Sequence, residues 1–326
     1  MTRGRPVNEQ QGAALLLAMV IVALVATVTA GMVWQQTRAV QVEAAERARA
    51  QAGWILSGAL DWARLILRED LRNNRSGAQP HDSLDEPWAT PLAEARLSTF
   101  LAADKDNNTD AGPEAFISGS ISDAQARFNL RGLLADDGKV LPPQQAALDR
   151  LCSQAGAPTD TAQRIVQGLQ ASLFPEAEAT ASTAAGPPLR PGRLADLAWL
   201  GIDLATLARL EPFVDMLPVA TPVNLNTAPR EVIVAAIDGI DLGSAERLVQ
   251  ARQRKPFRTL DEAREQLPQG TTLEPNRVSV ISSYFEVAGR LRLEDRVLEE
   301  RSLLVRRENQ VDVLRRERQS FTTAER

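Results

Sequence analysis

The chain has 326 residues, which is long enough for about two domains and a sizeable apolar core. Hydrophobic residues make up 44% and charged residues 24%, so the composition excludes a globally disordered chain. The formal net charge of -5 excludes a general electrostatic attraction to nucleic acid or anionic lipid. A single cysteine, Cys152, excludes an internal disulfide.

An apolar segment follows a short basic leader. Residues 13–34 contain no charged side chain, and as a helix they would span about 33 Å, enough to cross a bilayer. The leader, residues 1–12, carries Arg3 and Arg5 against Glu9, which favours a cytoplasmic N-terminus. We therefore expect a single-pass inner-membrane protein whose C-terminal domain lies in the periplasm.

Three processing fates are open for this segment. Cleavage after Ala30, at the small-x-small pattern Val28-Thr29-Ala30, would release a soluble periplasmic scaffold. An uncleaved segment would remain as an anchor. Cleavage between Gly12 and Ala13, as in type IV prepilins, would leave the apolar segment at the start of the mature chain. Retention is favoured because the segment is longer than the roughly 7 to 15 apolar residues of a typical signal core.

The helical pattern continues beyond the membrane segment. No proline occurs from residue 35 to residue 72, and apolar residues recur there at helical spacing with charged residues on the other faces. The pattern predicts one continuous helix over residues 13–73. A membrane helix followed by an unrelated coiled stalk is the alternative.

Beyond this helix, turn residues mark a loop over residues 73–91, and a short helix is expected over 92–103. A β-hairpin is expected from residues 115–123 and 125–130. The later pattern predicts helices at 142–155, 160–172 and 193–210, a linker at 176–191, two helices after Thr227 and Gly243, and strands at 278–287, 290–297 and 300–305. The end of the chain, residues 313–326, is polar and charged, and residues 315–326 are expected to be loosely ordered.

Three sequence blocks occur together in a known protein family. The block QQGAALLLAMVIVAL, residues 10–24, resembles a prepilin-peptidase site. The block ISDAQARFNLRGL, residues 121–133, is similar to a D-x-x-x-x-x-N-L element, and TPVNLNTAPREVI, residues 221–233, is similar to a V-N-L-N-T-A-P element. Together the blocks resemble the K subunits (GspK) of the type II, or general, secretion pathway, which are minor pseudopilins.

One position strengthens this resemblance and another departs from it. Most pseudopilins carry a glutamate five residues after the scissile glycine, where this chain has Leu17. In a fibre that buried carboxylate needs the terminal ammonium of a neighbouring subunit, which a subunit at the tip lacks. The K subunits resemble one another in lacking the glutamate. Ala13 departs from the Phe or Met that pilins commonly have after the cleavage site.

The resemblance implies an α+β fold, in which a long N-terminal transmembrane and amphipathic helix packs on an antiparallel pilin-like sheet. A large inserted helical domain, of the helix-hairpin-helix or SAM-like kind, would interrupt the sheet. The expected divisions are a prepilin leader at 1–12, a transmembrane helix at 13–34, its amphipathic continuation at 35–73, pilin-like parts at 74–133 and 277–312, the helical insertion at 134–276, and a polar tail at 313–326.

The resemblance also implies a place in the cell. Prepilin peptidase would cleave after Gly12, and Ala13 would become the methylated N-terminus. The chain would sit at the tip of a periplasmic pseudopilus with the minor pseudopilins I and J and other pseudopilins. There it would help initiate assembly by the inner-membrane platform and the export of folded proteins across the outer membrane.

A membrane-anchored DNA receptor is a competing interpretation, because residues 223–267 resemble a helix-hairpin-helix module. In DNA-binding versions the hairpin reads Gly-hydrophobic-Gly, whereas here it reads Gly239-Ile240-Asp241. Asp238 and Asp241 flank the turn and would repel a phosphate. From residue 222 to residue 268, seven basic residues face seven acidic ones, which is no basic footprint. Nucleic acid is therefore not an expected partner.

The element VNLNTAP also has a structural interpretation. Asn224 and Asn226 are expected to hydrogen-bond the backbone of a turn, and Thr227 is expected to cap the helix that follows.

An acidic loop, DKDNNTDAGPE, offers a possible metal site. Asp104, Asp106, Asp110 and Glu114 place carboxylates at short spacing in a loop with Gly and Pro, and calcium favours such oxygen ligands. The loop lacks the full EF-hand pattern, so a solvated acidic loop is the alternative. Calcium is the one cofactor expected.

Enzyme activity is not expected. The sequence has no nucleophile elbow, phosphate-binding loop or zinc-ligand spacing, and its single histidine, His81, excludes histidine-based triads.

Overall fold

The computed structural model describes residues 10–77, 79–97, 115–175, 188–293, 296–308 and 310–322. The chain divides into two compact units, Met1–Ser57 and Gly58–Arg326. Helix α1, Gln10–Ser76, begins in the first unit and contains no proline over its 67 residues. By length and composition α1 can cross a membrane, and the side chains of residues 13–34 are exposed. The prediction of a continuous helix is confirmed.

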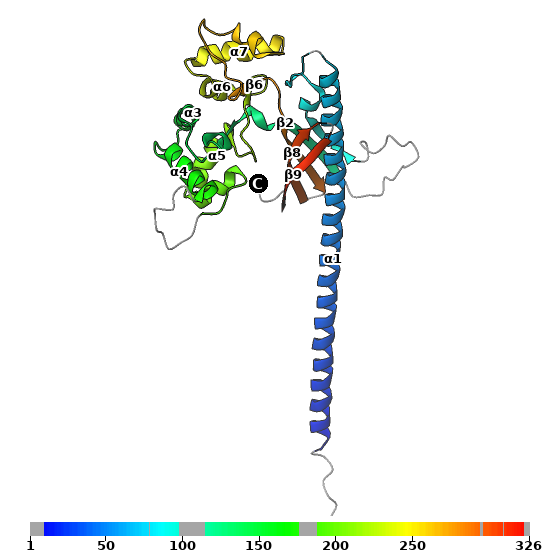
Figure 1. Ribbon diagram of the computed structural model, residues 1–326. Coiled ribbons are helices and arrows are strands. Elements are labelled where there is room, and N and C mark those ends of the chain that lie inside the picture. Colours follow the sequence, from blue (N-terminus) through cyan, green and yellow to red (C-terminus); the bar gives the residue numbers. More distant parts are fainter. Residues whose placement is uncertain are drawn as a thin grey trace, which may run out of the picture. The chain divides into compact units, whose positions relative to one another are not determined.

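Within the described residues, five strands of the second unit form an antiparallel sheet (Figure 1). The order of its strands is β1-β2-β7-β8-β9. The strands are β1, Leu92–Arg96; β2, Ala115–Asp123; β7, Tyr284–Leu293; β8, Arg296–Arg307; and β9, Gln310–Thr322. Strands β2 and β7 are neighbours over their whole paired length, although a helical insertion separates them in the sequence. The sheet therefore needs both flanks of the insertion.

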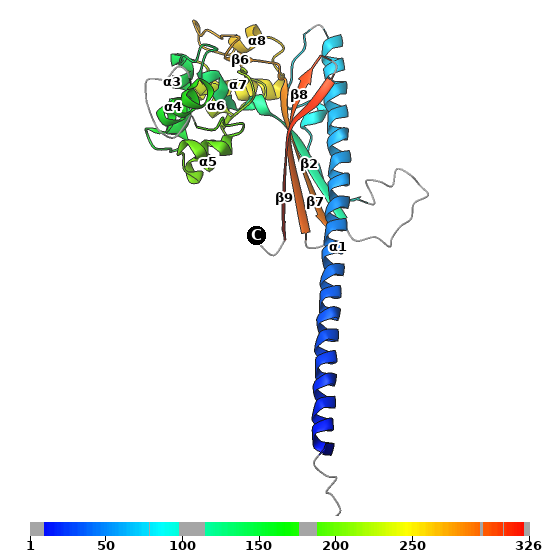
Figure 2. The ribbon, with the colours of Figure 1, turned by 60° about the horizontal axis from the view of Figure 1, so that its bottom comes forward.

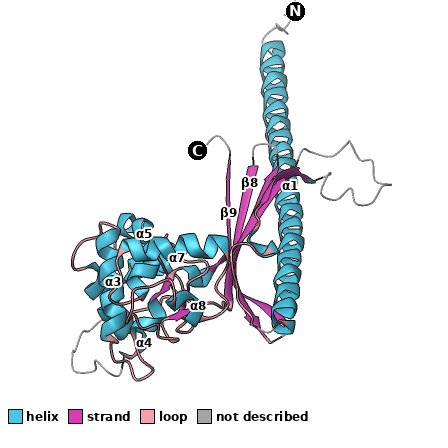
Figure 3. Cartoon of the chain, turned by 90° about the horizontal axis from the view of Figure 1, so that it is seen from above, coloured by secondary structure: helices cyan, strands magenta, loops and turns pink. Residues whose placement is uncertain are grey.

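The last turns of α1 pack on one face of this sheet (Figure 3). Trp88 lies on the short 3₁₀ helix η1, Pro87–Ala89, and meets Phe285 edge to face with 5.1 Å between ring centroids. These rings join a buried apolar cluster that also contains Leu60, Ala63, Leu67, Val287, Leu304 and Val311. An apolar stripe of α1 is thus buried against the sheet, which confirms the expected α+β fold.

The insertion between β2 and β7 is mainly helical (Figure 2). It has its own apolar core. Its helices are α3, Pro142–Gln154; α4, Thr161–Leu173; α5, Leu204–Leu210; α6, Arg230–Ala236; α7, Leu242–Arg254; and α8, Leu260–Arg264. Its 3₁₀ helices are η2, Ala124–Ala126; η3, Leu130–Leu133; and η5, Leu194–Leu200.

Two short parallel strand pairs lie at the borders of this insertion. Strand β3, Phe128–Asn129, pairs with β4, Val214–Asp215. Strand β5, Val223–Asn224, pairs with β6, Val278–Ser279. Each pair joins a strand from one family-like block, β3 or β5, to a strand that is distant in the chain.

Two expectations for the start of the sheet are wrong. The expected helix over 92–103 begins instead as β1, which pairs with β2; residues 98–114 lie outside the described residues. The expected hairpin of 115–123 and 125–130 does not form, because β2 pairs with β1 and β7 while β3 pairs with β4. Neighbouring β-prone segments cannot reveal that their partners come from far along the chain.

Two later boundaries also differ. The helix expected over 193–210 is broken into η5 and α5 by Gly201, whose φ of 81° is the left-handed conformation that glycine adopts without strain. The strand break expected near residue 288 is absent, since β7 runs through Gly289. That glycine pairs with Gly119 of β2, so it lies inside the ladder and forms no turn.

The expectation of a loosely ordered end is wrong for residues 315–322, because they belong to β9. This strand pairs with β8 from Gln310 to Thr322, with one register shift opposite Leu303 and Leu304. The arginines and the glutamate of β9 interrupt the alternation of apolar and polar residues that normally predicts a strand.

A matched pair of substitutions on β9 tests this edge strand. Val311→Ala is expected to lower the free energy of unfolding by about 1–3 kcal/mol, because the valine is buried against α1 and the sheet. Leu314→Ala is the control, since Leu314 is 41% exposed and its loss should change stability by about 0.5 kcal/mol or less. Urea unfolding of the detergent-solubilised chain measures both. Equal effects would argue against this register.

Candidate functional site

The family-like blocks meet at a buried carboxylate, Asp123, where the insertion joins the sheet. Its Oδ2 accepts hydrogen bonds from Thr227 Oγ1 at 2.6 Å, Ser282 Oγ at 2.6 Å and Asn224 Nδ2 at 3.0 Å. Its Oδ1 accepts one from the backbone N–H of Gln125 at 2.8 Å. One side chain thus holds both ends of the insertion, and we call these five residues the junction network.

The two asparagines of VNLNTAP fix the local backbone. Asn224 Oδ1 accepts the N–H of Asn226, and Asn224 Nδ2 also donates to the carbonyl oxygen of Asp82 at 3.1 Å. Asn226 makes a two-way pair with the backbone of Phe257, at 2.8 and 2.9 Å. The expectation that these asparagines bind backbone groups is confirmed.

The expected role of Thr227 is wrong. Pro229, without a side-chain hydrogen bond, occupies the N-cap position of α6. The Thr227 hydroxyl donates to Asp123 instead. The sequence around Thr227 predicted a helix cap. Its hydroxyl instead bonds to a carboxylate from another block, and an ionised carboxylate is a stronger acceptor than a neutral group.

A second buried cluster adjoins the junction network and was not foreseen from the sequence. Arg306 is buried, donates to Asp70 at 2.6 Å, pairs with Asp82, and donates to the carbonyl oxygen of Ser282 at 2.9 Å. Its guanidinium lies 4.7 Å from the centre of the Phe285 ring. An arginine in a charged strand gives no sequence signal for such partners.

Three carboxylates gather around this arginine. Oxygen atoms of Asp70, Asp82 and Glu86 lie within 4.8 Å of one another, which makes them the one group among the described residues that could hold a metal ion. Burial, with Glu86 nearby, raises the pKa of Asp70 to about 6, and burial also raises the pKa of Glu86. Arg306 already neutralises part of this charge, so the cluster is a structural ion-pair network.

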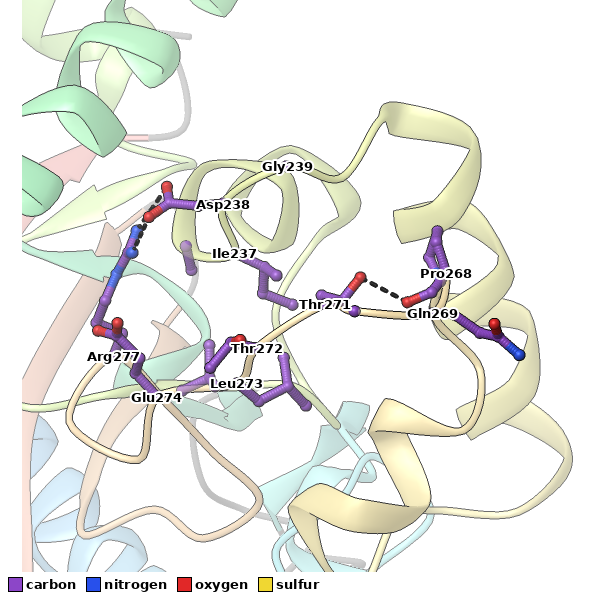
Figure 4. Close-up of a pocket in the computed structure, with 13 residues that line it drawn as sticks. Ile237, Asp238, Gly239, Pro268, Gln269, Thr271, Thr272, Leu273, Glu274 and Arg277 are labelled. Atoms are coloured by element: carbon purple, nitrogen blue, oxygen red, sulfur yellow. Dashed lines mark hydrogen bonds and ion pairs between the residues drawn. The ribbon is translucent and has the colours of Figure 1, made fainter.

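The turn between α6 and α7 has its polar groups occupied by protein partners. Asp238 accepts from Arg150 at 2.8 Å and pairs with Arg277, which lowers its pKa (Figure 4). Asp241 caps α7 by accepting the N–H of Ser244 at 2.8 Å. A carboxylate thus already occupies the helix start that would hold a phosphate.

A pocket of about 360 Å³ lies beside this turn, between residues 236–239 and the loop 268–274. Arg277 lines one side of it and points to Asp238 (Figure 4). Two arginines, Arg150 and Arg277, share the single carboxylate of Asp238, so neither is available as a free anion ligand.

The remaining predicted site residues fall into two groups. Gly12 and Ala13 both lie in α1. Asp104, Asp106, Asp110 and Glu114 lie outside the described residues, and calcium binding there stays a prediction.

The single cysteine, Cys152, is buried. Burial raises the pKa of its thiol to about 11, so the thiol is inert near neutral pH.

Comparison with known families matches residues 126–219 and 223–282 to the family described as type II secretion system (T2SS), protein K. A protein from Pseudomonas aeruginosa named type II secretion system protein K is 31% identical over 302 residues, covering 88% of this chain and 86% of the relative. A protein of the same name from Pectobacterium carotovorum is 28% identical over 344 residues, covering 97% and 98%.

The fold also matches a solved structure. A chain in the crystal structure of the GspK-GspI-GspJ complex from the type 2 secretion system of enterotoxigenic Escherichia coli superposes with a TM-score of 0.62. The two sequences are 21% identical, and the match covers 84% of this chain and 98% of that chain.

Replacing the junction carboxylate should weaken the fold in a pH-dependent way. Asp123→Asn puts an amide N–H₂ where donors now converge, so at pH 7.5 we expect a loss of about 1–3 kcal/mol in the free energy of unfolding. Burial raises the pKa of Asp123 to about 6 from its ordinary 3.8, so the folded state holds the proton more tightly than the unfolded state. That contribution to stability is complete below about pH 4 and is lost as the pH rises through 6.

The difference in stability between the unmodified chain and Asp123→Asn should therefore be largest near pH 4 and smaller at pH 7.5. Urea unfolding at a series of pH values measures it. The exposed Asp136 supplies the control variant, Asp136→Asn. A difference that stays constant from pH 4 to 7.5 would contradict the role given to burial.

Proposed function

Since the chain belongs to the type II secretion system protein K family, we propose that it is a minor pseudopilin at the tip of the secretion pseudopilus. The observation that supports this most is the continuity of α1, which carries the apolar segment 13–34 and, further along, the residues that pack on the sheet. Cleavage after Ala30 would remove most of the apolar segment from this helix, whereas cleavage after Gly12 would remove only its first residues, 10–12.

A tip position also accounts for Leu17. An ionisable side chain within a membrane-spanning segment is costly unless a partner charge is present. In a fibre the partner would be the N-terminal ammonium of the next subunit. A subunit with nothing above it has no such partner, and a leucine avoids the unpaired charge.

The helical insertion gives the second argument for the tip. It has its own apolar core, which shares no residue with the cluster that packs α1 on the sheet. We propose that this added mass blocks the stacking of a further subunit. The chain would then begin a pseudopilus, and its growth beneath the tip would drive the export of folded proteins across the outer membrane.

The proposed partners follow from this position. The solved complex joins a K protein to GspI and GspJ, and we propose that this chain assembles with the corresponding I and J pseudopilins in the same way. Prepilin peptidase would process it, the inner-membrane platform would assemble it, and its C-terminal domain would lie in the periplasm. The role is mechanical and requires no catalytic group.

DNA binding is the weaker candidate function. A helix-hairpin-helix receptor needs free backbone amides at the turn and a basic surface around it. In this chain Asp241 accepts the helix-start amide of Ser244, and the nearby Asp238 is held by two arginines. Both carboxylates have lowered pKa values, so both are ionised at neutral pH and would oppose a phosphate.

Introducing the missing glutamate tests the tip position. Leu17→Glu should cost about 2–3 kcal/mol in assembly, or roughly a 30-fold or greater loss of complex, because its carboxylate would have no ammonium partner. Co-purification of I and J with the tagged full-length chain, and secreted exoprotein in the medium, measure the effect. Leu17→Met is the control and should behave as the unmodified chain. Normal assembly of the Glu variant would contradict a position without a neighbour above.

We further propose that the loop with Asp104, Asp106, Asp110 and Glu114 binds calcium. Hard oxygen ligands at this spacing would order the loop around the ion. A chelator should then lower the melting temperature of the chain by several degrees, and added calcium should restore it. Asp104→Ala should remove most of this response, whereas Asp149→Ala, which lies outside the loop, should retain it. A chelator without effect on the unmodified chain would exclude the site.

A further inference from the structure

The helical insertion is attached to the sheet through two chain crossings that lie side by side. One leaves the end of β2 through η2, and the other returns from β6 to the start of β7. Asp123 stands opposite Phe285 in the ladder and accepts a hydrogen bond from Ser282 on the return crossing. Both crossings are therefore fixed at one place, which is the geometry of a hinge.

Few apolar contacts hold the insertion to the sheet. The buried cluster between them contains Ala124, Leu217, Tyr284, Leu303 and Val305. Ala124 belongs to η2 at the first crossing, so among the described residues 134–175 and 188–276 Leu217 is the one member of this cluster. An interface with so little buried apolar surface permits relative motion of its two sides.

Away from the crossings, the two sides are joined by charged groups. Arg193 pairs with Glu317 of β9 at 2.7 Å, and Arg315 of β9 donates to the carbonyl oxygen of Gly192 at 2.7 Å. Arg301 of β8 lies 3.5 Å from Glu211. We call these six residues the latch.

The latch is partly exposed and encloses a cavity. The side chains of Arg193 and Glu317 are 43% and 30% exposed, and those of Arg301 and Glu211 are 60% and 57% exposed. A cavity of about 120 Å³ lies among latch residues and Arg127. Pairs as exposed as these are weak individually and are screened by salt.

We propose that the contacts of the latch break at high salt, and that the insertion then rotates about the junction network. The latch is partly exposed, whereas the carboxylate of the junction network is buried. Dissolved ions screen exposed charges over about 3 Å at 1 M salt but do not reach a buried hydrogen-bonded carboxylate such as Asp123. The hinge therefore stays intact under conditions that open the latch.

The motion follows from this chain's own contacts and does not depend on where the chain sits in a pseudopilus. At a tip it would let the insertion change its angle while the sheet stays fixed to α1.

Distance measurements on the full-length chain in detergent test the proposal. Spin labels at Gln253→Cys on α7 and Gln319→Cys on β9 report the separation of the insertion from the sheet, since both positions are exposed. The buried Cys152 thiol does not compete for the label. We expect one narrow distance distribution at 0.1 M salt and a second, longer population at 1 M salt.

Charge reversal within the latch gives the same test without a rise in salt concentration. Arg193→Glu should produce the longer population at 0.1 M salt, and adding Glu317→Arg should restore the single distance. Arg230→Glu is the matched control, because Arg230 pairs with Glu246 inside the insertion at similar exposure and its loss should leave the distance unchanged.

Two outcomes would overturn the proposal. One is an unchanged distance at 1 M salt, and the other is a longer population that Arg230→Glu produces as readily as Arg193→Glu. Should Arg193→Glu fail to fold, Arg193→Gln and the salt series on the unmodified latch decide the question.

Discussion

The hydrogen bonds to the buried carboxylate of Asp123 are the interaction on which the rest of the structure depends. They join the end of β2 to the turn before α6 and to the segment that leads into β7. They fix the two ends of the insertion at one place, where Gln125 Oε1 also accepts the backbone N–H groups of Ser283 and Tyr284 and where the ladder between β2 and β7 ends. A carboxylate suits this position because it can accept several hydrogen bonds, whereas a carboxamide has one acceptor oxygen and two donor hydrogens.

The sequence predicted those parts of the fold whose signals are local. Helix α1 follows from the absence of proline and the repeated apolar stripe, and most helices of the insertion follow from their apolar spacing. Strands β1 and β9 were missed because their partners are distant in sequence or because charged side chains cover their apolar alternation. The position of Gly289 within a strand also depended on a partner, Gly119, that no local pattern identifies.

The candidate site was predictable only in part, for the same reason. The block around Asp123 and the block around Asn224 were both recognised by resemblance, and the asparagines were expected to bind backbone. That the two blocks bind each other required the fold, and it changed the role of Thr227 from a helix cap to a donor for Asp123. Arg306, which links Asp70 and Asp82 beside the junction network, had no sequence signal because its three-way contact joins α1, a loop and β8.

Together these features describe a chain in which one helix serves two environments, with a membrane-compatible start and an end that completes the core of the sheet domain. The central claim is that the mature protein keeps the apolar segment 13–34 of this helix and that the leader, residues 1–12, is removed. The mass of the mature N-terminal peptide from cells with an active type II secretion system tests it most directly. We predict a chain that begins at Ala13 and carries a methyl group on its amino nitrogen; a chain that begins at Gly31 would contradict the account.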